Sequence, residues 1–390
     1  MDFQPTDEEK TLREKARGFL DKEIVPIANE YDRRYQPLSK EMAIELFEKL
    51  VPLGFVGGLI PREEGGSGLS FVLHGILFEE LARAFGGLAY MTAVHNDMGV
   101  ALLSRIGTDR QKAKWLRPLA RGKMIAGFAV TEANRGSQAS DFETVAVRDG
   151  KGRYVVNGAK IMTSNATVLD LVGILVTTHK GERAREGTTY LLVDKSESEF
   201  EARGISKLGF RCQSIGELVF RDCRVPQENL IGKEGEGLGP AFDFIRLGRC
   251  HHALMAVGIA QSALEVTVKY IQERTLFNKP VGRHQFTAGM IYEMAAELEA
   301  ARLLSYKALD LVEKGVATEM EPSMAKAYAT ETSARVTSKA IEIHGIYGLS
   351  GSSTVERLFR DGRMLTIPDG ANEIHKLIVA RHYTGMGAFT

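Results

Sequence analysis

The sequence predicts a mainly helical α+β protein with three consecutive parts: a helical N-terminal domain (residues 1–122), a middle β-domain (123–234) and a C-terminal helical bundle (235–390). Apolar residues recur at helical spacing in the first and third parts. In the middle part, short β-type runs are separated by turn residues. A chain of 390 residues is also long enough for two or three domains that share a core.

The N-terminal part begins with a helix signal. Thr6 is followed three residues later by Glu9, which is a capping-box pattern before a long amphipathic stretch. Gly- and Pro-containing breaks follow at 52–54 and 61–68. Another helix is expected from about 69 to 84, and a further one begins near Ala89.

The middle part changes to the period of β-strands. The runs 144–147 and 154–156 flank Asp149 and Gly150, which predicts a hairpin. Further strands are expected at 171–176, 190–193 and 217–220. Because no long helix separates these runs, they predict a small antiparallel barrel or sandwich.

The C-terminal part returns to helices. Apolar residues recur there every three or four positions, which is typical of a buried helix face. They are Ala253, Val257, Ala260, Leu264, Val268 and Ile271. Long helical patterns also cover roughly 284–314 and 322–345.

Composition excludes several classes of function. Lys plus Arg and Asp plus Glu both total 50, so the formal charge is zero, which disfavours a nucleic-acid-binding protein. The three cysteines lack CxxC spacing, so we expect neither a zinc site nor disulfides. The sequence contains no run of about 18 apolar residues, so it gives no indication of a membrane span. Since the acidic N-terminus is unlike a signal peptide, we expect a cytoplasmic protein.

Three motifs occur in a fixed order along the chain. They comprise residues 128–137 (FAVTEANRGS), then 274–277 (RTLF) with Gln285, and finally 343–345 (IHG), 355–361 (VERLFRD) and 369–374 (DGANEI). Together they resemble the acyl-CoA dehydrogenase family over nearly the whole chain. The resemblance implies a helical N-terminal domain, a middle antiparallel β-barrel domain and a C-terminal four-helix bundle. It also implies FAD, bound between the β-domain and the bundle and partly across a subunit contact, in a homodimer or homotetramer.

The resemblance assigns cofactor contacts to residues in all three motifs. Val130 and Thr131 would place donors at the flavin edge, where reduction puts negative charge, and Thr163 would lie near flavin N5. Arg274 and Phe277 would hold the pyrophosphate and adenine of FAD, from a neighbouring subunit. The complete set is Phe128, Val130, Thr131, Ser137, Thr163, Arg274, Phe277, Gln285, Glu342, Gly345, Ala371 and Glu373. The alternatives are ordinary β-sheet threonines at 131 and 163 and a surface salt-bridge arginine at 274.

The implied reaction is an α,β-oxidation of an acyl thioester. A carboxylate removes the α-proton while the β-hydrogen leaves as hydride to flavin N5, and an electron-transferring flavoprotein then accepts the electrons. Many family members have Glu-Gly-Thr at the base position, where this chain has Asp369, Gly370 and Ala371. Asp369 is therefore the candidate catalytic base. An Asp carboxylate falls roughly 1–1.5 Å short of a Glu carboxylate, and errors of about 1 Å can cost ~100-fold in rate.

A second position holds the base in some relatives, immediately before the arginine that Arg249 matches. Here that position is Gly248, which has no side chain. Ile161 stands where many relatives have a Trp at the flavin. Glu342 replaces a Gln that commonly faces the FAD pyrophosphate.

The substrate contacts implied are Ser137, Asp97, Arg246, Arg249 and Gly370. Ser137 matches a contact to the pantetheine arm. Arg246 occupies a place often held by an Asp at the pantetheine, so the acyl carrier is either CoA or an acyl carrier protein. Asp97 lies on a helix that lines the acyl pocket in the family, although a solvated or capping aspartate is the favoured interpretation.

Three other polar residues are interpreted as structural. Glu132 belongs to the first motif, and His251 and His252 are adjacent, so they point to different sides of a helix and do not form a metal pair. We expect these histidines to be packing or polar-surface residues. No metal site is predicted.

Alternative functions remain open at this point. One is an oxidase or monooxygenase on the same fold, as in nitroalkane oxidase, which uses an Asp base. A second is a dehydrogenase of alicyclic acyl-CoA that uses a different acid. A third is a flavoprotein that has lost turnover. The sequence does not identify the acyl group, and it does not distinguish a dimer from a tetramer.

Overall fold

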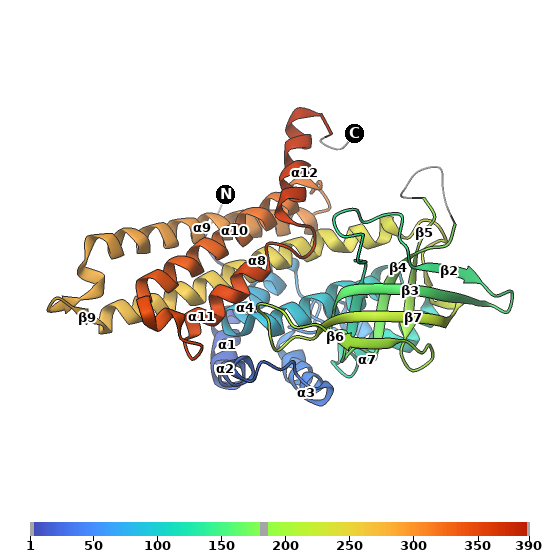
Figure 1. The fold of residues 1–390 in the computed structure, drawn as a ribbon, viewed down its shortest axis with the longest axis horizontal. Helices are drawn as coiled ribbons and strands as arrows, with labels where there is room; N and C mark the ends of the chain where they lie inside the picture. The colour runs from blue at the N-terminus through green and yellow to red at the C-terminus, as the bar shows by residue number, and fades with distance from the viewer. Residues whose placement is uncertain (1–3, 180–185, 388–390) are drawn as a thin grey trace.

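The structure is a computed structural model that describes residues 4–179 and 186–387. Long helices fill one side of an elongated molecule and a twisted sheet fills the other (Figure 1). The predicted order of helices, sheet and helices is confirmed.

The N-terminal helices and short turns are α1 Asp7–Glu23, α2 Val25–Arg34, α3 Lys40–Leu50, η1 Val51–Leu53, η2 Arg62–Glu64, α4 Phe71–His95, η3 Asn96–Ala101, α5 Leu102–Ile106, α6 Asp109–Gln111, η4 Lys112–Leu116 and α7 Arg117–Ala120. Both hydrogen bonds of the capping box between Thr6 and Glu9 are present, as predicted. The two helices predicted around 69–84 and from Ala89 are present as the two helical parts of α4, which meet at a kink where the backbone of Phe85 is not helical (φ −154°, ψ 89°). The kink explains why the helical pattern is interrupted there.

The middle strands are β1 Ala126–Ala129, β2 Val145–Arg148, β3 Arg153–Ser164, β4 Leu171–Thr177, β5 Thr188–Asp194, β6 Glu201–Gly204, β7 Ile215–Pro226 and β8 Leu230–Ile231, with the turn η5 Gln227–Asn229 before β8. They form one sheet in the order β6-β7-β3-β2-β4-β5-β8, and β1 also pairs with β4. The predicted hairpin of β2 and β3 is confirmed. Most neighbours are antiparallel, but β1 and β2 each pair with β4 in parallel.

The C-terminal elements are α8 Leu238–Glu273, β9 Thr275–Leu276, β10 Lys279–Pro280, η6 Val281–Arg283, α9 Gln285–Glu313, α10 Met320–His344, η7 Gly345–Leu349, α11 Thr354–Met364 and α12 Asn372–Thr384. Helix α8 is the centre of the bundle, and residues 247–260 are all buried. A Cβ on Gly258 would lie 2.1 Å from Glu79 O, so glycine permits the close approach of α8 to α4. Among the described helices, α8 alone is long and apolar enough to cross a membrane, but most of its apolar stretch is covered by protein, as in a core helix.

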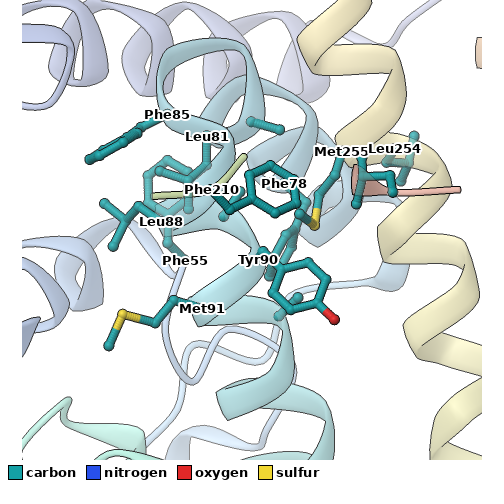
Figure 2. Packing of buried hydrophobic residues seen from close by; sticks show 14 of the residues in the cluster. Phe55, Phe78, Leu81, Phe85, Leu88, Tyr90, Met91, Phe210, Leu254 and Met255 are labelled. Carbon is teal, nitrogen blue, oxygen red and sulfur yellow. The ribbon is translucent and has the colours of Figure 1, made fainter. Parts of the chain in front are cut away.

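The core around α4 is built mainly of large apolar side chains. Figure 2 shows Phe78 and Tyr90 of α4 beside Phe210, from the loop before β7, and Met255 of α8. Burial of these side chains joins the three parts of the chain into one body.

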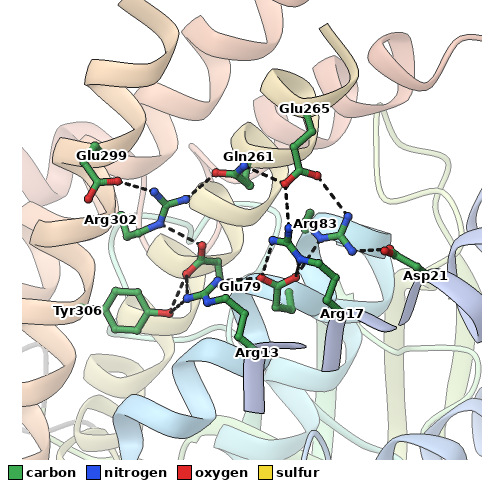
Figure 3. A network of polar contacts seen from close by, with 11 residues as sticks. Arg13, Arg17, Asp21, Glu79, Arg83, Gln261, Glu265, Glu299, Arg302 and Tyr306 are labelled. Carbon is green, nitrogen blue, oxygen red and sulfur yellow. Dashed lines mark hydrogen bonds and ion pairs between the residues drawn. The ribbon is translucent and has the colours of Figure 1, made fainter. Parts of the chain in front are cut away.

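A network of ion pairs connects α4 to the helices around it (Figure 3). Glu79 is 1% exposed and contacts Arg13 of α1 at 3.1 Å and Arg302 of α9 at 3.1 Å. Burial alone would raise the pKa of Glu79, but the two guanidinium groups outweigh it and lower the pKa. The carboxylate is therefore ionised and ties three helices together.

Candidate active site

Asp369 lies in the turn between α11 and α12, and its side chain faces α8. Its backbone is left-handed (φ 55°), and so is that of Gly370 (φ 96°). A non-glycine residue in this region is uncommon and is often found at functional sites. The Oδ2 atom of Asp369 lies 3.1 Å from Nδ1 of His252 on α8.

Gly248 provides the space that this carboxylate occupies. A Cβ on Gly248 would lie 2.9 Å from Oδ2 of Asp369 and 3.6 Å from Oδ2 of Asp97. The missing side chain at 248 and the short acid at 369 are therefore neighbours in space. Two carboxylates, Asp369 and Asp97, face the same point on α8.

Asp97 is buried, so its interpretation as a solvated aspartate was wrong. It lies in the π-helical turn η3, directly after α4, and π-helical turns are frequent at functional sites. Both of its carboxylate oxygens contact Nδ1 of His251, at 2.9 and 3.0 Å. The Nε2 atom of His251 lies 3.4 Å from Nδ1 of His74, whose pKa is lowered by burial and then by His251.

The adjacent histidines are not surface residues. His251 and His252 are both buried, and each contacts a different aspartate because they point to different sides of α8. The signal that could have predicted this is the apolar run from Ala253 onward. A histidine on a helix that is buried on all sides needs a polar partner from elsewhere in the fold.

Lys326 on α10 was not predicted as a site residue. It is fully buried, and its Nζ donates to Gly370 O at 2.8 Å and to Asn372 Oδ1 at 3.0 Å. Burial lowers the pKa of Lys326 to about 7, although the nearby Asp369 acts in the opposite direction. The lysine therefore anchors the turn that carries Asp369.

The two arginines predicted at the substrate both reach Glu319, before α10. Arg249 Nη1 lies 2.6 Å from Glu319 and 3.3 Å from Ser323 Oγ, and Arg246 Nε lies 2.8 Å from Glu319. Close by, His375 is buried, and burial together with Lys326 and Arg249 lowers its pKa to about 3. The predicted Gly370 lies against this histidine ring.

A second part of the site lies at the ends of β1 and β3. The backbone N–H of Ile161 donates to Thr131 O at 2.8 Å, and a bulge follows in β3, where Met162 has φ 54°. Thr163 is buried, yet its hydroxyl finds no hydrogen-bond partner within the described chain. Because buried hydroxyls are normally paired, this atom fits a polar group supplied by a cofactor.

Glu132 is structural, as interpreted. Its carboxylate contacts the fully buried Lys160 at 2.8 Å and accepts hydrogen bonds from the backbone N–H groups of Glu143 and Thr144. Burial lowers the pKa of Lys160 to about 8. These contacts close the loop 132–144, in which Ser137 is exposed. Lys160 also donates to Val130 O at 3.1 Å, which fixes the end of the strand where cofactor contacts are predicted.

The other predicted cofactor residues fall into two groups. Ala371 and Glu373 begin α12 beside the Asp369 turn, and Phe128 lies on β1 with its ring 5.7 Å from that of Tyr190. Arg274, Phe277, Gln285, Glu342 and Gly345 instead lie around β9 and the ends of α8–α10.

Figure 1 places β9 at the end of the molecule opposite to the sheet. Phe277 is 89% exposed with φ 51°, and the Arg274 guanidinium lies 5.6 Å from the Tyr347 ring centroid. A single chain therefore does not bring this distal group to Thr163 and Asp369.

Family models match all three parts of the chain. They are the acyl-CoA dehydrogenase N-terminal domain (residues 6–123), middle domain (127–223) and C-terminal domain (235–384).

Curated relatives match over nearly the whole length. The short-chain specific acyl-CoA dehydrogenase of Clostridium acetobutylicum is 34% identical over 381 residues, which cover 97% of this chain and 99% of the relative. The caffeyl-CoA reductase-Etf complex subunit CarC of Acetobacterium woodii is 33% identical over 376 residues, which cover 96% of this chain and 98% of the relative.

Solved structures agree with the fold. Butyryl-CoA dehydrogenase from Megasphaera elsdenii is similar with a TM-score of 0.93 and 31% identity, covering 98% of this chain and 100% of that one. The prolyl acyl carrier protein oxidase AnaB has a TM-score of 0.89 and 28% identity, with coverage of 98% and 100%. A Mycobacterium smegmatis glutaryl-CoA dehydrogenase in complex with FADH2 has a TM-score of 0.91 and 25% identity, with coverage of 99% and 97%.

These matches confirm the predicted fold class and the resemblance. The chain belongs to the acyl-CoA dehydrogenase family of oxidoreductases.

Proposed function

We propose that this protein is an FAD-dependent enzyme that oxidises an acyl thioester to its α,β-unsaturated product, with Asp369 as the general base. The observation that carries the proposal is the position of the Asp369 carboxylate, which fills the space left open at Gly248. Gly248, at the family's second base position, has no side chain, whereas Asp369, at the first, has an acid that lies against α8.

The residues of the β-domain fit the cofactor. Thr163 offers a buried hydroxyl without a partner in the described residues, and Val130 and Thr131 lie at the adjoining strand end. When bound, FAD supplies an acceptor for two electrons. The similarity to a glutaryl-CoA dehydrogenase in complex with FADH2 supports this choice of cofactor.

The distal group suggests that two copies of the chain share each cofactor. Arg274 and Phe277 extend from the end of the bundle opposite to the sheet, and exposed apolar side chains lie near them, including Phe286 and Tyr292. We propose a homo-oligomer in which these residues reach the FAD of a neighbouring copy. A guanidinium is well suited to bind the pyrophosphate.

The carboxylate of Asp369, which would accept the proton, lies close to α8 although the side chain is short. Without a Cβ at 248, the carboxylate can approach the helix to a distance that any larger residue would prevent. Removal of the α-proton needs a base that is placed within about an ångström of its proper position. Lys326 supports the turn by holding Gly370 O.

The acyl group is carried by CoA or by a carrier protein. The relatives named above include a CoA enzyme and a carrier-protein oxidase, so both carriers belong in the assay. We propose an electron-transferring flavoprotein as the acceptor, supported by the relative that is a subunit of an Etf complex.

A second candidate function is the oxidation of an alicyclic acyl thioester. It is favoured by Asp97, whose carboxylate is buried and faces the same point on α8 as Asp369. In this case Asp97 would accept a proton from a ring carbon. Substrate panels should therefore contain cyclic as well as linear acyl groups.

The test is an anaerobic titration of the purified yellow protein with acyl-CoA and acyl-carrier-protein thioesters, followed by the flavin absorbance. We expect a linear or cyclic thioester to bleach the flavin of the wild type and not of Asp369→Asn, which should retain FAD. Bleaching of Asp369→Asn at the wild-type rate would exclude Asp369 as the base. If Asp97→Asn alone loses the reaction, the second candidate holds. A wild-type protein that binds FAD but reacts with no thioester would refute both.

A further inference from the structure

Asp97 is a buried carboxylate with a single hydrogen-bond donor. Nδ1 of His251 bonds to both of its oxygens, at 2.9 Å for Oδ1 and 3.0 Å for Oδ2. No other hydrogen bond reaches this carboxylate from residues 4–179 and 186–387. An ionised carboxylate has about four acceptor sites, and one N–H is shared between the two oxygens here. Most of the acceptor capacity of Asp97 is therefore unfilled, although the residue is only 2% exposed.

Two other rings hold the ring of His251 in place. It stacks on Phe78 with centroids 4.4 Å apart, and it meets the ring of His74 edge-on at 5.2 Å. Since a carboxylate can only accept, the proton of His251 lies on Nδ1, and Nε2 is free to accept from Nδ1 of His74 at 3.4 Å. All three rings are fully buried. The core of the protein thus fixes the direction of the Asp97 carboxylate.

The Asp97 carboxylate faces the space beside Gly248. A Cβ on Gly248 would meet two heavy atoms of the described chain within 4 Å, apart from its neighbours in α8: Oδ2 of Asp97 at 3.6 Å and Oδ2 of Asp369 at 2.9 Å. In the proposed reaction, Asp369 takes a proton from carbon 2 of the acyl group. Because one point lies within 4 Å of both oxygens, an acyl group that starts at Asp369 reaches Asp97 within a few bonds.

We propose that Asp97 binds a hydrogen-bond donor on the acyl group, an O–H or N–H at carbon 3 or 4, and that His251 is the positioning residue that directs the carboxylate toward it. This rests on the proposed role of Asp369 as the base. A buried carboxylate with one donor is costly, and a donor from the ligand completes its hydrogen bonds. A purely aliphatic acyl group would cover the carboxylate and leave it unpaired. The substrate class is thus a hydroxyacyl or aminoacyl thioester.

The test is a binding measurement by calorimetry on the dithionite-reduced holoenzyme, which cannot oxidise its ligand. It compares thioesters in which a methyl group replaces a hydroxyl: 3-hydroxybutyryl with 3-methylbutanoyl, and 4-hydroxypentanoyl with 4-methylpentanoyl, each on CoA and on a carrier protein. We expect the hydroxyl member of at least one pair to bind about tenfold more tightly, because the methyl member cannot donate to the carboxylate. Equal or tighter binding of the methyl member in both pairs would overturn the proposal.

Two variants of His251 separate positioning from packing. His251→Phe keeps a ring against Phe78 but has no N–H, so Asp97 loses both its donor and its fixed direction. The amide nitrogen of His251→Asn can take the place of Nδ1 and keep the hydrogen bond. We expect the hydroxyl preference to fall to about twofold in His251→Phe and to stay near the wild-type value in His251→Asn. An unchanged preference in His251→Phe, or an equal loss in both variants, would refute the positioning role.

Asp97→Leu removes the acceptor and keeps a side chain of similar shape. This variant should bind the methyl member of each pair at least as tightly as the hydroxyl member, and a retained hydroxyl preference would contradict the role of Asp97. Failure of the proposed function is seen separately. If no thioester reduces the flavin of the oxidised wild type, the role of Asp369 as the base fails, and the binding preference of the reduced enzyme still decides the role of Asp97.

Discussion

Replacing Gly248 by alanine adds one methyl group at the point where the two acids meet. The added Cβ would lie 2.9 Å from Asp369 Oδ2, closer than ordinary van der Waals contact, which begins near 3.4 Å. The Asp97 carboxylate, at 3.6 Å, is already at an ordinary distance. The substitution therefore displaces mainly the Asp369 side chain, by about half an ångström.

The structure sets the expected size of the effect. An error of about 1 Å in the position of a reacting group can cost ~100-fold in rate. The shift of about half an ångström expected for Asp369 should therefore slow the reaction roughly tenfold. The stability of the folded protein should instead increase, because alanine is favoured over glycine inside a helix by about 1 kcal/mol. Gly248→Ala should thus be slower but no less stable than the wild type.

Stopped-flow reduction of the flavin under anaerobic conditions measures the rate, and thermal unfolding measures the stability. The matched control is Gly239→Ala in the first turn of the same helix, where an added Cβ has no neighbour within 4 Å among the described residues. This control should reduce its flavin at the wild-type rate. Wild-type reduction by Gly248→Ala would refute the close approach of Asp369 to α8.

Two further predictions concern buried charges. Lys326→Met should slow flavin reduction about tenfold, because the turn at Gly370 loses its anchor. Since the pKa of Lys326 is lowered to about 7, the unfolded chain binds the extra proton between pH 7 and about 10, so wild-type stability should rise relative to Lys326→Met across this range in denaturant titrations. No difference between the two pH profiles would contradict the burial of the ammonium group. Glu79→Gln should cost about 3 kcal/mol of unfolding free energy at pH 7, because Arg13 and Arg302 lose their shared partner. The pKa of Glu79 is lowered, so this wild-type advantage should shrink as the pH falls below about 4.5, and an advantage that persists in acid would contradict the ionised pairing.

Local patterns predicted most of the elements. The capping box at Thr6 and the hairpin around Asp149 and Gly150 depend on residues close in sequence, and both are present. The two helical parts of α4 were also predicted, because the helical pattern breaks at the kink.

The candidate site was only partly predictable. The motif around Asp369 identified a candidate acid, but its proximity to Gly248 joins residues that are far apart in the chain. Asp97 was interpreted as solvated because one sequence does not show which residue covers it, and its partner, His251, is 154 residues away. The sequence signal for a buried lysine at 326 was weak: it is only a lysine between two alanines on a buried helix. Its partners are Gly370, in the turn before α12, and Asn372, the first residue of α12, and they come close to Lys326 only in the folded chain.

The most direct test of the proton-abstracting role of Asp369 is isotope exchange at carbon 2 of a saturated acyl thioester. The enzyme is first reduced chemically, so that the thioester cannot be oxidised, and is then incubated with the thioester in D2O while deuterium uptake is followed by NMR. We expect the wild type to catalyse the exchange and Asp369→Asn, with FAD bound, to lose it by about 100-fold or more. Exchange at the wild-type rate in Asp369→Asn would show that another group removes the proton.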